Sequence, residues 1–408
     1  MKILNFGSCN IDYVYSLDHI VKGGETETTH KMNVFPGGKG LNQSIAAARA
    51  GAGVYHAGCV GYDGGILTEV MSKSGVDISY IKKTDGKNGH AIIQVSKDGE
   101  NSIFLFPGSN ETVSKEYIDA VLADFAEGDI LILQNEISNV DYIVKKAHKR
   151  GMCIILNPSP FNEKIRDIDF GCLSYIILNE IEIAEVTGCK TPEDGLAYIR
   201  QEYPRLKTVL TLGSKGSVYS GADGELFQPS FKVNVVDTTA AGDTFTGYFV
   251  AEMSIGTDCR TALRLASAAA ALAVSAEGAS SSIPCKDEVV RVIDGLAEST
   301  RDNKSEKLLR RIDKYIEDNI TDASINGLAK ELGYSAVYTG ALVKKLTGQP
   351  FSKKLRSKRC GIAAERLLNT DMPIAEIAES IGYENKSFFR KIFKESFGKN
   401  PLEFRKNK

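Results

Sequence analysis

The sequence predicts an α/β fold, in which a parallel sheet with helices on both faces and a small β lid precedes an all-helical region. Two patterns lead to this prediction. From about 113 to 215, short apolar strand patterns alternate with helical ones, which is typical of a parallel sheet covered by helices. From Glu306 on, apolar residues recur at helical spacing. A length of 408 residues also favours two or three domains over one.

The charge of the chain is distributed unevenly. Residues 301–408 carry 23 Lys and Arg against 14 Asp and Glu, whereas residues 1–300 carry 27 against 38. A basic segment attached to an acidic body indicates that the segment meets a polyanion such as nucleic acid. Solvated surface charge without a partner is the alternative.

Cysteine usage and hydropathy indicate the compartment. The eight cysteines are scattered singly with no Cys-x-x-Cys pair, which argues against zinc sites and disulfide frameworks. The start of the chain becomes polar too early for a signal peptide, and no run of about 18 apolar residues could span a membrane. We therefore expect a cytoplasmic protein with no membrane partner.

Polar residues follow the first predicted strand, which covers Lys2 to Gly7. Asn10 and Asp12 come next, where α/β sheets hold ligands, and they could cap a turn or hold sugar hydroxyls. The glycine turn 36–40 precedes a helix predicted over 44–50. This turn lacks the spacing of a phosphate-binding P-loop, but its Lys and Asn side chains could hold a polyhydroxylated ligand.

The alternating region supplies further polar groups at strand ends. Residues 88–107 predict a two-stranded ribbon, which is either a surface hairpin or a lid. Strands are predicted at 130–133, 153–156, 175–178 and 208–211, and polar residues follow them: Glu136, Asn157, Asn179 and Glu182. Polar groups at consecutive strand ends build one crevice. The turn 211–216 could wrap a nucleotide or be a plain turn.

The stretch from Val235 to Gly247 is the most informative. Its valines predict the end of a strand, and its small residues predict a turn before a helix over 244–251. Backbone N–H groups of residues 241–243 would then point into open space at a helix start, which is an anion site. Asp243 inside it could cap the helix, or act as a general base that deprotonates an attacking hydroxyl.

Residues 1 to about 296 resemble the ribokinase family of carbohydrate kinases, of the PfkB type. The resemblance is carried by Asn10-Ile11-Asp12, by residues 37–43, by Asn179-Glu180-Ile181-Glu182 and by residues 237–247. It implies a kinase that phosphorylates a sugar hydroxyl with ATP and Mg²⁺. Ribose is the first expectation, from Lys39, Asn42 and Gln43, while another pentose, a hexose or a nucleoside remains open.

The resemblance also implies a role for each matching residue. Asp243 is the catalytic base, and the anion hole is formed by the amides of Ala240, Ala241, Gly242 and Asp243. The sugar-binding positions are Asn10, Asp12, Gly38, Lys39, Asn42, Glu136 and Asp243. The nucleotide positions are Asn179, Thr211, Gly213, Ser214, Gly216 and Gly242. Mg²⁺ is ordered through water by Asn179 and Glu182, and a monovalent cation (K⁺) is placed at Asp237, Thr239, Ala273, Ala276, Gly278 and Ser282. A homodimer formed through the lid ribbons is implied as well.

After a kinase-like domain over 1–296, we expect a linker over 297–305 and a second domain over 306–408. In the second domain a helix, a glycine turn and a helix occur twice, which predicts a double helix-turn-helix. A small helical bundle that binds no nucleic acid is the alternative.

Residues 306–406 look like the DNA-binding domain of AraC-type transcription regulators, most clearly at Gly382-Tyr383, at residues 387–390 and at Asn400-Pro401. This implies that the second helix of each motif enters a major groove of double-stranded DNA. The expected DNA contacts are Thr339, Lys344, Asn385, Lys386, Ser387, Arg390, Lys391 and Lys394. Gly340 and Ala341 leave the second helix of the first motif without long polar side chains at these positions. We therefore expect the second motif to supply more of the DNA affinity, mainly through phosphates.

Together these features predict a sugar kinase fused to a sequence-specific transcription regulator, with the kinase domain as the sugar sensor. One alternative is a catalytically silent, sugar-responsive regulator. Another is a metabolic kinase whose tail only tethers it to DNA.

Overall fold

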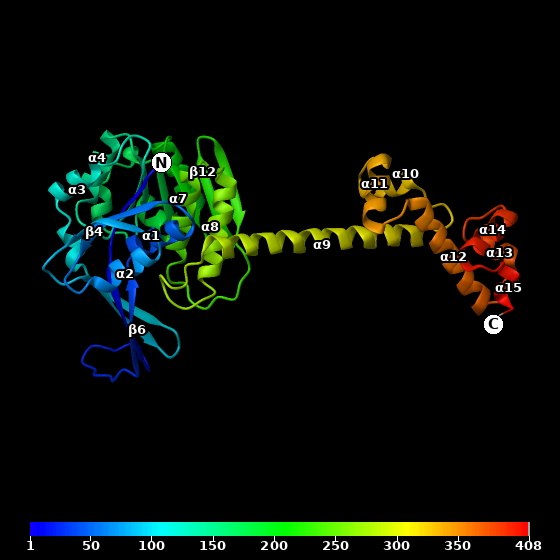
Figure 1. Ribbon diagram of the computed structural model, residues 1–408, viewed down its shortest axis with the longest axis horizontal. Helices are drawn as coiled ribbons and strands as arrows, with labels where there is room; N and C mark the ends of the chain where they lie inside the picture. The colour runs from blue at the N-terminus through cyan, green and yellow to red at the C-terminus, as the bar shows by residue number, and fades with distance from the viewer. Residues whose placement is uncertain (407–408) are drawn as a thin grey trace. The chain divides into compact units, whose positions relative to one another are not determined.

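The computed structural model describes residues 1–406, except for the side chains of residues 295–307. The chain divides into two compact units, Met1–Ile293 and Asp294–Lys408. The first unit contains two sheets with helices around them, and the second is helical (Figure 1).

A nine-stranded sheet forms the centre of the first unit, in the order β13-β12-β11-β10-β9-β8-β1-β4-β5. In chain order the strands are β1 (Ile3–Phe6), β4 (Val54–Val60), β5 (Asp77–Lys83), β8 (Ile130–Gln134), β9 (Cys153–Asn157), β10 (Tyr175–Asn179), β11 (Lys207–Thr211), β12 (Gly216–Gly221) and β13 (Gly224–Pro229). The strands from β11 to β5 are parallel, and β12 and β13 are antiparallel at one edge. The predicted α/β fold is confirmed, with this antiparallel edge in addition.

Helices cover both faces of this sheet, because alternate side chains of its strands enter two separate cores. Ile3 of β1 belongs to one core, and its neighbours Leu4 and Phe6 belong to the other. The first core is covered by α1 (Lys39–Arg49), α2 (Gly65–Lys73), α7 (Ala241–Ser254) and α8 (Cys259–Ala273); helices α3 (Lys115–Leu122), α4 (Val140–Lys149), α5 (Glu180–Thr187) and α6 (Pro192–Glu202) cover the second. Helix α7 packs closely on α1 at Gly247, where a Cβ would lie 2.4 Å from that of Ala46.

The lid is a second, four-stranded sheet rather than a two-stranded ribbon. Its order is β3-β2-β6-β7, formed by β2 (Asn10–Leu17), β3 (Lys31–Gly37), β6 (Gly89–Ser96) and β7 (Asn101–Phe106). Asn10 and Asp12 therefore lie on a strand that begins just after β1, and not in a turn. The alternation of β2 is weak because most of its side chains are half-buried, which hid it from the periodicity.

Two predicted boundaries near the glycine turn and the small-residue turn are wrong. Helix α1 begins at Lys39, five residues before the predicted start. The valines before Asp237 form no strand: the N–H groups of Val236 and Asp237 bond the carbonyl of Val274 at 2.8 and 3.2 Å. The end of α8 holds this segment, so no neighbouring strand is needed to satisfy its backbone.

The second unit contains the predicted pairs of helices. The first pair is α10 (Ile325–Leu332) and α11 (Ala336–Thr347), and the second is α13 (Ile374–Glu379) and α14 (Lys386–Phe397). Helix α12 (Phe351–Asn369) joins the pairs, and α15 (Pro401–Arg405) follows them. Each pair has its own apolar core, around Leu328 and Val343 in one case and around Phe389 and Phe393 in the other.

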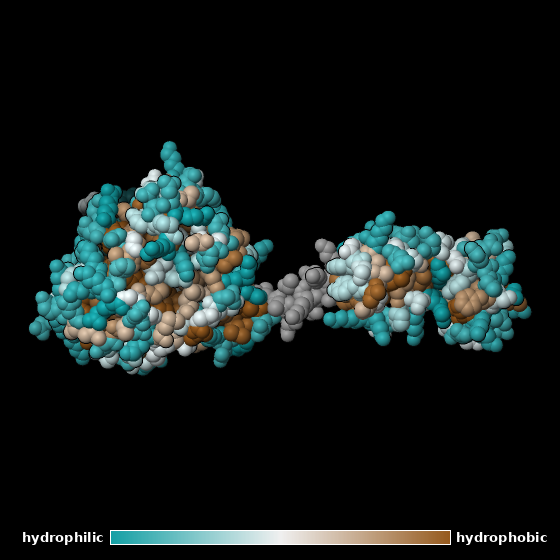
Figure 2. Space-filling view, turned by 90° about the horizontal axis from the view of Figure 1, so that it is seen from above, coloured by the Kyte–Doolittle hydropathy of each residue, from teal (hydrophilic) through white to brown (hydrophobic). Residues whose placement is uncertain are grey.

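Residues 297–305, which were expected to be a linker, lie within helix α9 (Lys286–Asp318). Their side chains lie outside the described residues, so their role as a linker and the domain boundaries drawn from it stay predictions. Among the described residues, no helix is long and apolar enough to cross a bilayer. The faces seen in Figure 2 are largely hydrophilic, with hydrophobic side chains gathered in separate areas.

Candidate functional site

Helix α7 begins with its N-terminus open. Its first residue is Ala241, and the residue before it, Ala240, has a left-handed backbone with φ of 58°. A Cβ placed on Gly242 would meet nothing within 4 Å, so the turn is open on that side of the residue. The N–H of Ala241 already bonds the carbonyl of Thr238 at 3.3 Å. The N–H groups of residues 242 and 243 therefore remain the main candidates for an anion site.

Asp243 lies in this first turn and does not cap the helix. Its carboxylate is 8% exposed and accepts N–H groups from two side chains of α1, Asn42 at 3.1 Å and Gln43 at 2.9 Å. Helix α7 has no side-chain cap. The capping alternative for Asp243 is therefore wrong, and the carboxylate is held for another purpose.

The glycine turn places the start of α1 against the same site. Gly38 has φ of 96°, a conformation that favours glycine, and α1 follows it directly. The backbone N–H of Lys39 donates to Glu136 at 3.0 Å, and the hydroxyl of Ser8 donates to the same carboxylate oxygen. Glu136 is thereby fixed at the end of β8. The early start of α1 is what puts Lys39 and Asn42 on the helix turn that faces Asp243.

Three carboxylates and one ammonium group influence each other here. Burial, together with the charges of Glu136 and Asp243, raises the pKa of Asp12 to about 7. Burial also raises the pKa of Glu136, although Lys39 and Ser8 oppose this change. Burial lowers the pKa of Lys39, but the neighbouring carboxylates outweigh it and the net change is upward. The ammonium therefore stays charged and partly offsets the negative charge of the site.

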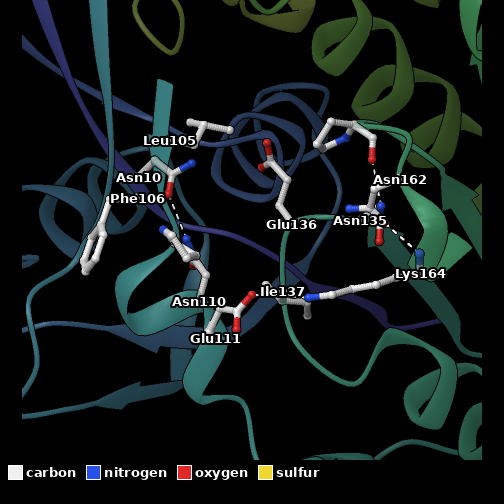
Figure 3. A pocket seen from close by; sticks show the side chains of 12 residues that line it. Asn10, Leu105, Phe106, Asn110, Glu111, Asn135, Glu136, Ile137, Asn162 and Lys164 are labelled. Atoms are coloured by element: carbon white, nitrogen blue, oxygen red, sulfur yellow. Dashed lines mark hydrogen bonds and ion pairs between the residues drawn. The ribbon is translucent and has the colours of Figure 1, made fainter. Parts of the chain in front are cut away.

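A cavity adjoins this cluster under the lid (Figure 3). Its lining comes from β7, from the loops after β7 and β8, and from residues 160–164. Asn10 and Glu136 were predicted to bind sugar and line it; the other predicted sugar residues do not.

Asn110 was not predicted as a site residue, although it lines the same cavity. The Asn110 side chain donates to Asn10 at 2.7 Å and accepts the N–H of Cys9 at 3.1 Å. Asn110 follows β7, an antiparallel strand of the lid, so the rule for the carboxyl ends of parallel strands that selected Glu136 does not extend to it.

The predicted Mg²⁺ residues form a helix cap in this structure. Asn179 accepts the N–H groups of Ile181 and Glu182 at 2.9 Å each, and Glu182 accepts the N–H of Asn179 at 3.0 Å. This is a capping box at the start of α5. Their remaining oxygen lone pairs suit Mg²⁺, which prefers oxygen ligands and keeps several waters.

The predicted nucleotide turn lies between β11 and β12. Thr211 ends β11 and donates to the carbonyl of Leu178 at 3.3 Å, while Gly213 and Ser214 are exposed. Gly216 has φ of 124° and a Cβ there would meet the carbonyl of Gln228 at 2.1 Å, so this position requires glycine. The turn is therefore open at its first half and tightly packed at its end.

Part of the predicted cation site is brought together. The carboxylate of Asp237 accepts the N–H and the hydroxyl of Thr239 at 2.9 and 2.6 Å and the N–H of Gly278 at 3.0 Å. Burial raises the pKa of Asp237, but these bonds outweigh it and lower the pKa below its usual value. The other predicted positions lie on the end of α8 and the loop after it: Ala273, Ala276 and Ser282. No group of three or more His, Cys, Asp or Glu able to hold a metal is found among the described residues.

The second helices of the two helical pairs differ in what they present. Thr339 of α11 was predicted to contact DNA, but it is 0% exposed and its hydroxyl bonds the carbonyl of Ser335 at 2.9 Å. That prediction is wrong, because the residue lies on the buried face of α11. The side chain of Asn385 caps α14 by accepting the N–H of Phe388 at 3.0 Å. The remaining predicted contacts are exposed: Lys344, Lys386, Ser387, Arg390, Lys391 and Lys394.

Comparison with known proteins identifies the first unit. Residues 1–286 match the model of the pfkB family of carbohydrate kinases. The chain is 35% identical over 297 residues to the ribokinase of Haemophilus influenzae, covering 71% of this chain and 97% of that protein. The chain belongs to the pfkB family. It is an ATP-dependent carbohydrate kinase by this membership.

Solved pfkB-type structures agree with the fold. The ribokinase of Thermotoga maritima has a TM-score of 0.66 and 36% identity, covering 72% of this chain and 99% of that one. The ribokinase of Arabidopsis thaliana, solved with ribose and ATP, has a TM-score of 0.63 and 28% identity, covering 71% and 97%.

Residues 328–407 match a family described as a helix-turn-helix domain. This pfkB kinase therefore carries an AraC-type helix-turn-helix domain at its C-terminal side.

Proposed function

We propose that this kinase transfers the terminal phosphoryl group of ATP to a hydroxyl of a ribose-like sugar, and that its kinase domain senses the sugar for the DNA-binding domain. The observation that carries the first half is the buried Asp243 carboxylate at the open start of α7. A sugar hydroxyl is a poor nucleophile at neutral pH, and a positioned base accelerates its reaction about 10²–10⁴-fold.

An unpaired oxygen next to Asp243 supports a polyhydroxylated substrate. The amide of Asn42 donates to Asp243, but its own oxygen is buried without a hydrogen-bond partner. A buried acceptor left unpaired is costly, so this oxygen calls for a donor from outside the protein. Sugar hydroxyls supply such donors, and the carboxylates of Asp12 and Glu136 offer acceptors for others.

The transfer would proceed with Asp243 taking the proton of the attacking hydroxyl. The hydroxyl oxygen forms a bond to the terminal phosphorus, and the bond from that phosphorus to the bridging oxygen breaks, so ADP leaves with the electron pair. The N–H groups at the start of α7 would stabilise the charge on the transferred group.

Bound Mg²⁺ would supply neutralising charge for the phosphates, held through water by Asn179 and Glu182. A monovalent cation (K⁺) would bind at Asp237 and the nearby backbone carbonyls. The carboxylate of Asp237 is already oriented by three donors, and the loops on either side are joined through it. These assignments are proposals that follow from the oxygen-rich chemistry of both sites.

One observation favours the silent regulator as the second candidate. Ala240 carries a methyl group in a left-handed conformation, and the N–H of Ala241 is used by Thr238. The N–H of Ala241 is therefore not free to bind a phosphoryl oxygen, and one donor fewer at this site would lower turnover.

DNA binding by the second unit is supported by the exposed basic face of α14. If sugar changes DNA affinity, the two ligands must favour different conformations, and DNA must change sugar affinity by the same factor. Closure of the lid over the sugar is the proposed transmitter.

A homodimer is proposed through the lid. Its edge strand β7 exposes four consecutive apolar side chains, Ile103 to Phe106, each about half accessible. An exposed apolar edge strand pairs readily with another chain.

The test is ATP turnover by the purified full chain across pentoses, hexoses and nucleosides, with Asp243→Asn as the control. Turnover with one sugar that the variant lowers by about 10²-fold or more would support a working kinase and identify its substrate. If no sugar is phosphorylated but one still raises the melting temperature of the protein, the result supports the alternative hypothesis of a catalytically silent regulator.

A further inference from the structure

We propose that Gln134 and Asn5 are positioning residues: they fix the orientation of the Gln43 amide, and Gln43 in turn holds the Asp243 carboxylate for catalysis. This inference rests on the proposed role of Asp243 as the base. The three residues with these amide side chains, Asn5, Gln43 and Gln134, are 0–1% exposed, so their amide groups are shielded from solvent.

The contacts form a continuous chain. The nitrogen of the Gln43 amide donates to Asp243 at 2.9 Å. Its oxygen accepts an N–H of Gln134 at 2.7 Å, and the same nitrogen of Gln134 donates to Asn5 at 3.0 Å. These residues come from α1, β8 and β1, and Asp243 comes from α7. Hydrogen bonds thus connect four elements of the first core at Asp243, the proposed catalytic base.

A backbone carbonyl at the far end decides the direction of every bond in this chain. The Asn5 nitrogen donates to the carbonyl of Gly40 at 2.8 Å and to the hydroxyl of Ser44 at 2.9 Å. A carbonyl can only accept, so Asn5 must turn its nitrogen to Gly40 and its oxygen to Gln134. Gln134 must then present its nitrogen, and Gln43 must present its oxygen to Gln134 and its nitrogen to Asp243.

A second carbonyl imposes the same direction from the other side. Asn157, at the end of β9, donates to the carbonyl of Ile177 at 3.0 Å. Its oxygen therefore faces Gln43, which donates to it at 3.3 Å. Both hydrogens of the Gln43 amide are used, one on Asp243 and one on Asn157, and a flip of this amide would oppose acceptor to acceptor at both contacts.

The arrangement carries a cost that a purely structural residue would avoid. The oxygen of Gln134 is buried with no hydrogen-bond partner. An unpaired buried acceptor lowers stability, and an apolar side chain of the same size would remove it. The value of an amide at this position therefore lies in the two N–H groups that it donates. Their effect at Asp243 is a fixed donor that orients the carboxylate.

The test is a double-mutant cycle in the full chain with Gln134→Met and Gln43→Met, measuring kcat, sugar affinity and the pH dependence of kcat. We expect Gln134→Met to lower kcat about tenfold, to change the pH profile of kcat and to leave sugar affinity unchanged. Because Gln134 acts only through Gln43, the double variant should have the same kcat as Gln43→Met alone. Gln201→Met, the same change at an exposed position of α6, is the matched control.

Two results would overturn the inference: a wild-type pH profile and kcat in Gln134→Met, or effects of the two substitutions that multiply. If Gln134→Met does not fold, Asn157→Ala removes the second anchor from a less buried position and should likewise lower kcat while leaving sugar affinity unchanged. Asp243→Asn separates this test from the proposed function. If that variant keeps wild-type turnover, the base assignment fails first; if it is inactive while Gln134→Met behaves as wild type, only the positioning role fails.

Discussion

Two aspartates in the site show how surroundings change one side chain. Asp243 receives N–H groups from Asn42 and Gln43. Asp12, on the lid strand β2, lies against Gly37, where a Cβ would come within 1.9 Å of its carboxylate. Burial and two neighbouring carboxylates raise the pKa of Asp12 to about 7. Two donors therefore surround the carboxylate of Asp243, whereas burial and like charges surround that of Asp12, which is close to half protonated at neutral pH.

This difference predicts how stability depends on pH. Because the folded-state pKa of Asp12 exceeds its usual value of 3.8, the folded protein binds this proton more tightly than the unfolded chain. Its contribution to stability is therefore complete at low pH and is lost as pH rises through about 7. We expect Asp12→Asn to raise the melting temperature at pH 8 and to have a much smaller effect at pH 5. Asp85→Asn, at an exposed position, is the control, and a pH-independent difference for Asp12→Asn would contradict the prediction.

The left-handed backbone conformation of Ala240 leads to a second prediction at the residue scale. A non-glycine residue at φ of 58° destabilises the folded state by roughly 1–2 kcal/mol. Glycine would remove this strain, but part of the gain is lost because glycine also increases the conformational entropy of the unfolded chain. We expect Ala240→Gly to stabilise the protein by about 0.5–1 kcal/mol, measured by denaturant unfolding. Ala241→Gly is the matched control, since Ala241 has helical geometry and the same change there should destabilise. Equal effects of the two substitutions would refute the strain argument.

At the scale of elements, helices α11 and α14 share their length and the kinds of residue that cap their ends, but they differ in the side chains that they expose. Each has twelve residues, a polar N-cap at Ser335 or Asn385, and a left-handed glycine after its last residue. Arg390 and Gly340 occupy equivalent positions, five residues after the N-cap. Since Arg390 offers charge and Gly340 does not, the two helices are expected to contribute unequally to DNA binding.

Arg390→Ala should therefore weaken binding to DNA and reduce the slope of log affinity against log salt by about 1. Gly340→Ala is the matched control on α11 and should leave that slope unchanged. Binding of the full chain to a selected DNA site at several salt concentrations measures both. An unchanged slope for Arg390→Ala would mean that α14 does not meet the phosphates.

At the scale of the whole molecule, the proposed sensor role requires reciprocal coupling. We expect a sugar that shifts DNA affinity by some factor to have its own affinity shifted by the same factor when DNA is bound. The Asp243→Asn variant, which the proposed base role of Asp243 makes inactive, allows both affinities to be measured without turnover. Sugar and DNA affinities that are independent of each other would leave a kinase whose tail only tethers it to DNA.

The lid provides a structural control for this coupling. Its strands β6 and β7 complete the four-stranded sheet beside Asn10 and Asp12, the residues proposed to bind the sugar. A variant that lacks residues 88–107 but keeps the fold should lose the effect of sugar on DNA binding. If the effect persists, the signal does not pass through the lid.

The sequence by itself determined the architecture and the chemistry of the family. Strand patterns separated by helices, the small-residue turn before Asp243 and the repeated helix-turn-helix are local signals, and local signals survive in a linear reading. Helix α14 begins after the Asn385 cap and ends before Gly398, and start and stop signals of this kind are visible in the sequence alone. The valines before Asp237 led to a wrong strand prediction, because a preference for strand is realised only when a partner strand is present.

Only the tertiary structure decided which polar residues meet. Asp243 lies some two hundred positions from Asn42 and Gln43 in the chain, and packing of α7 on α1 through Gly247 is what brings their side chains within 3.1 Å. The burial of Thr339, the contact of Asn110 with Asn10 and the direction of the amide chain behind Asp243 likewise depend on long-range contacts. Such contacts leave no periodic trace in the sequence, because each depends on the position of a second element.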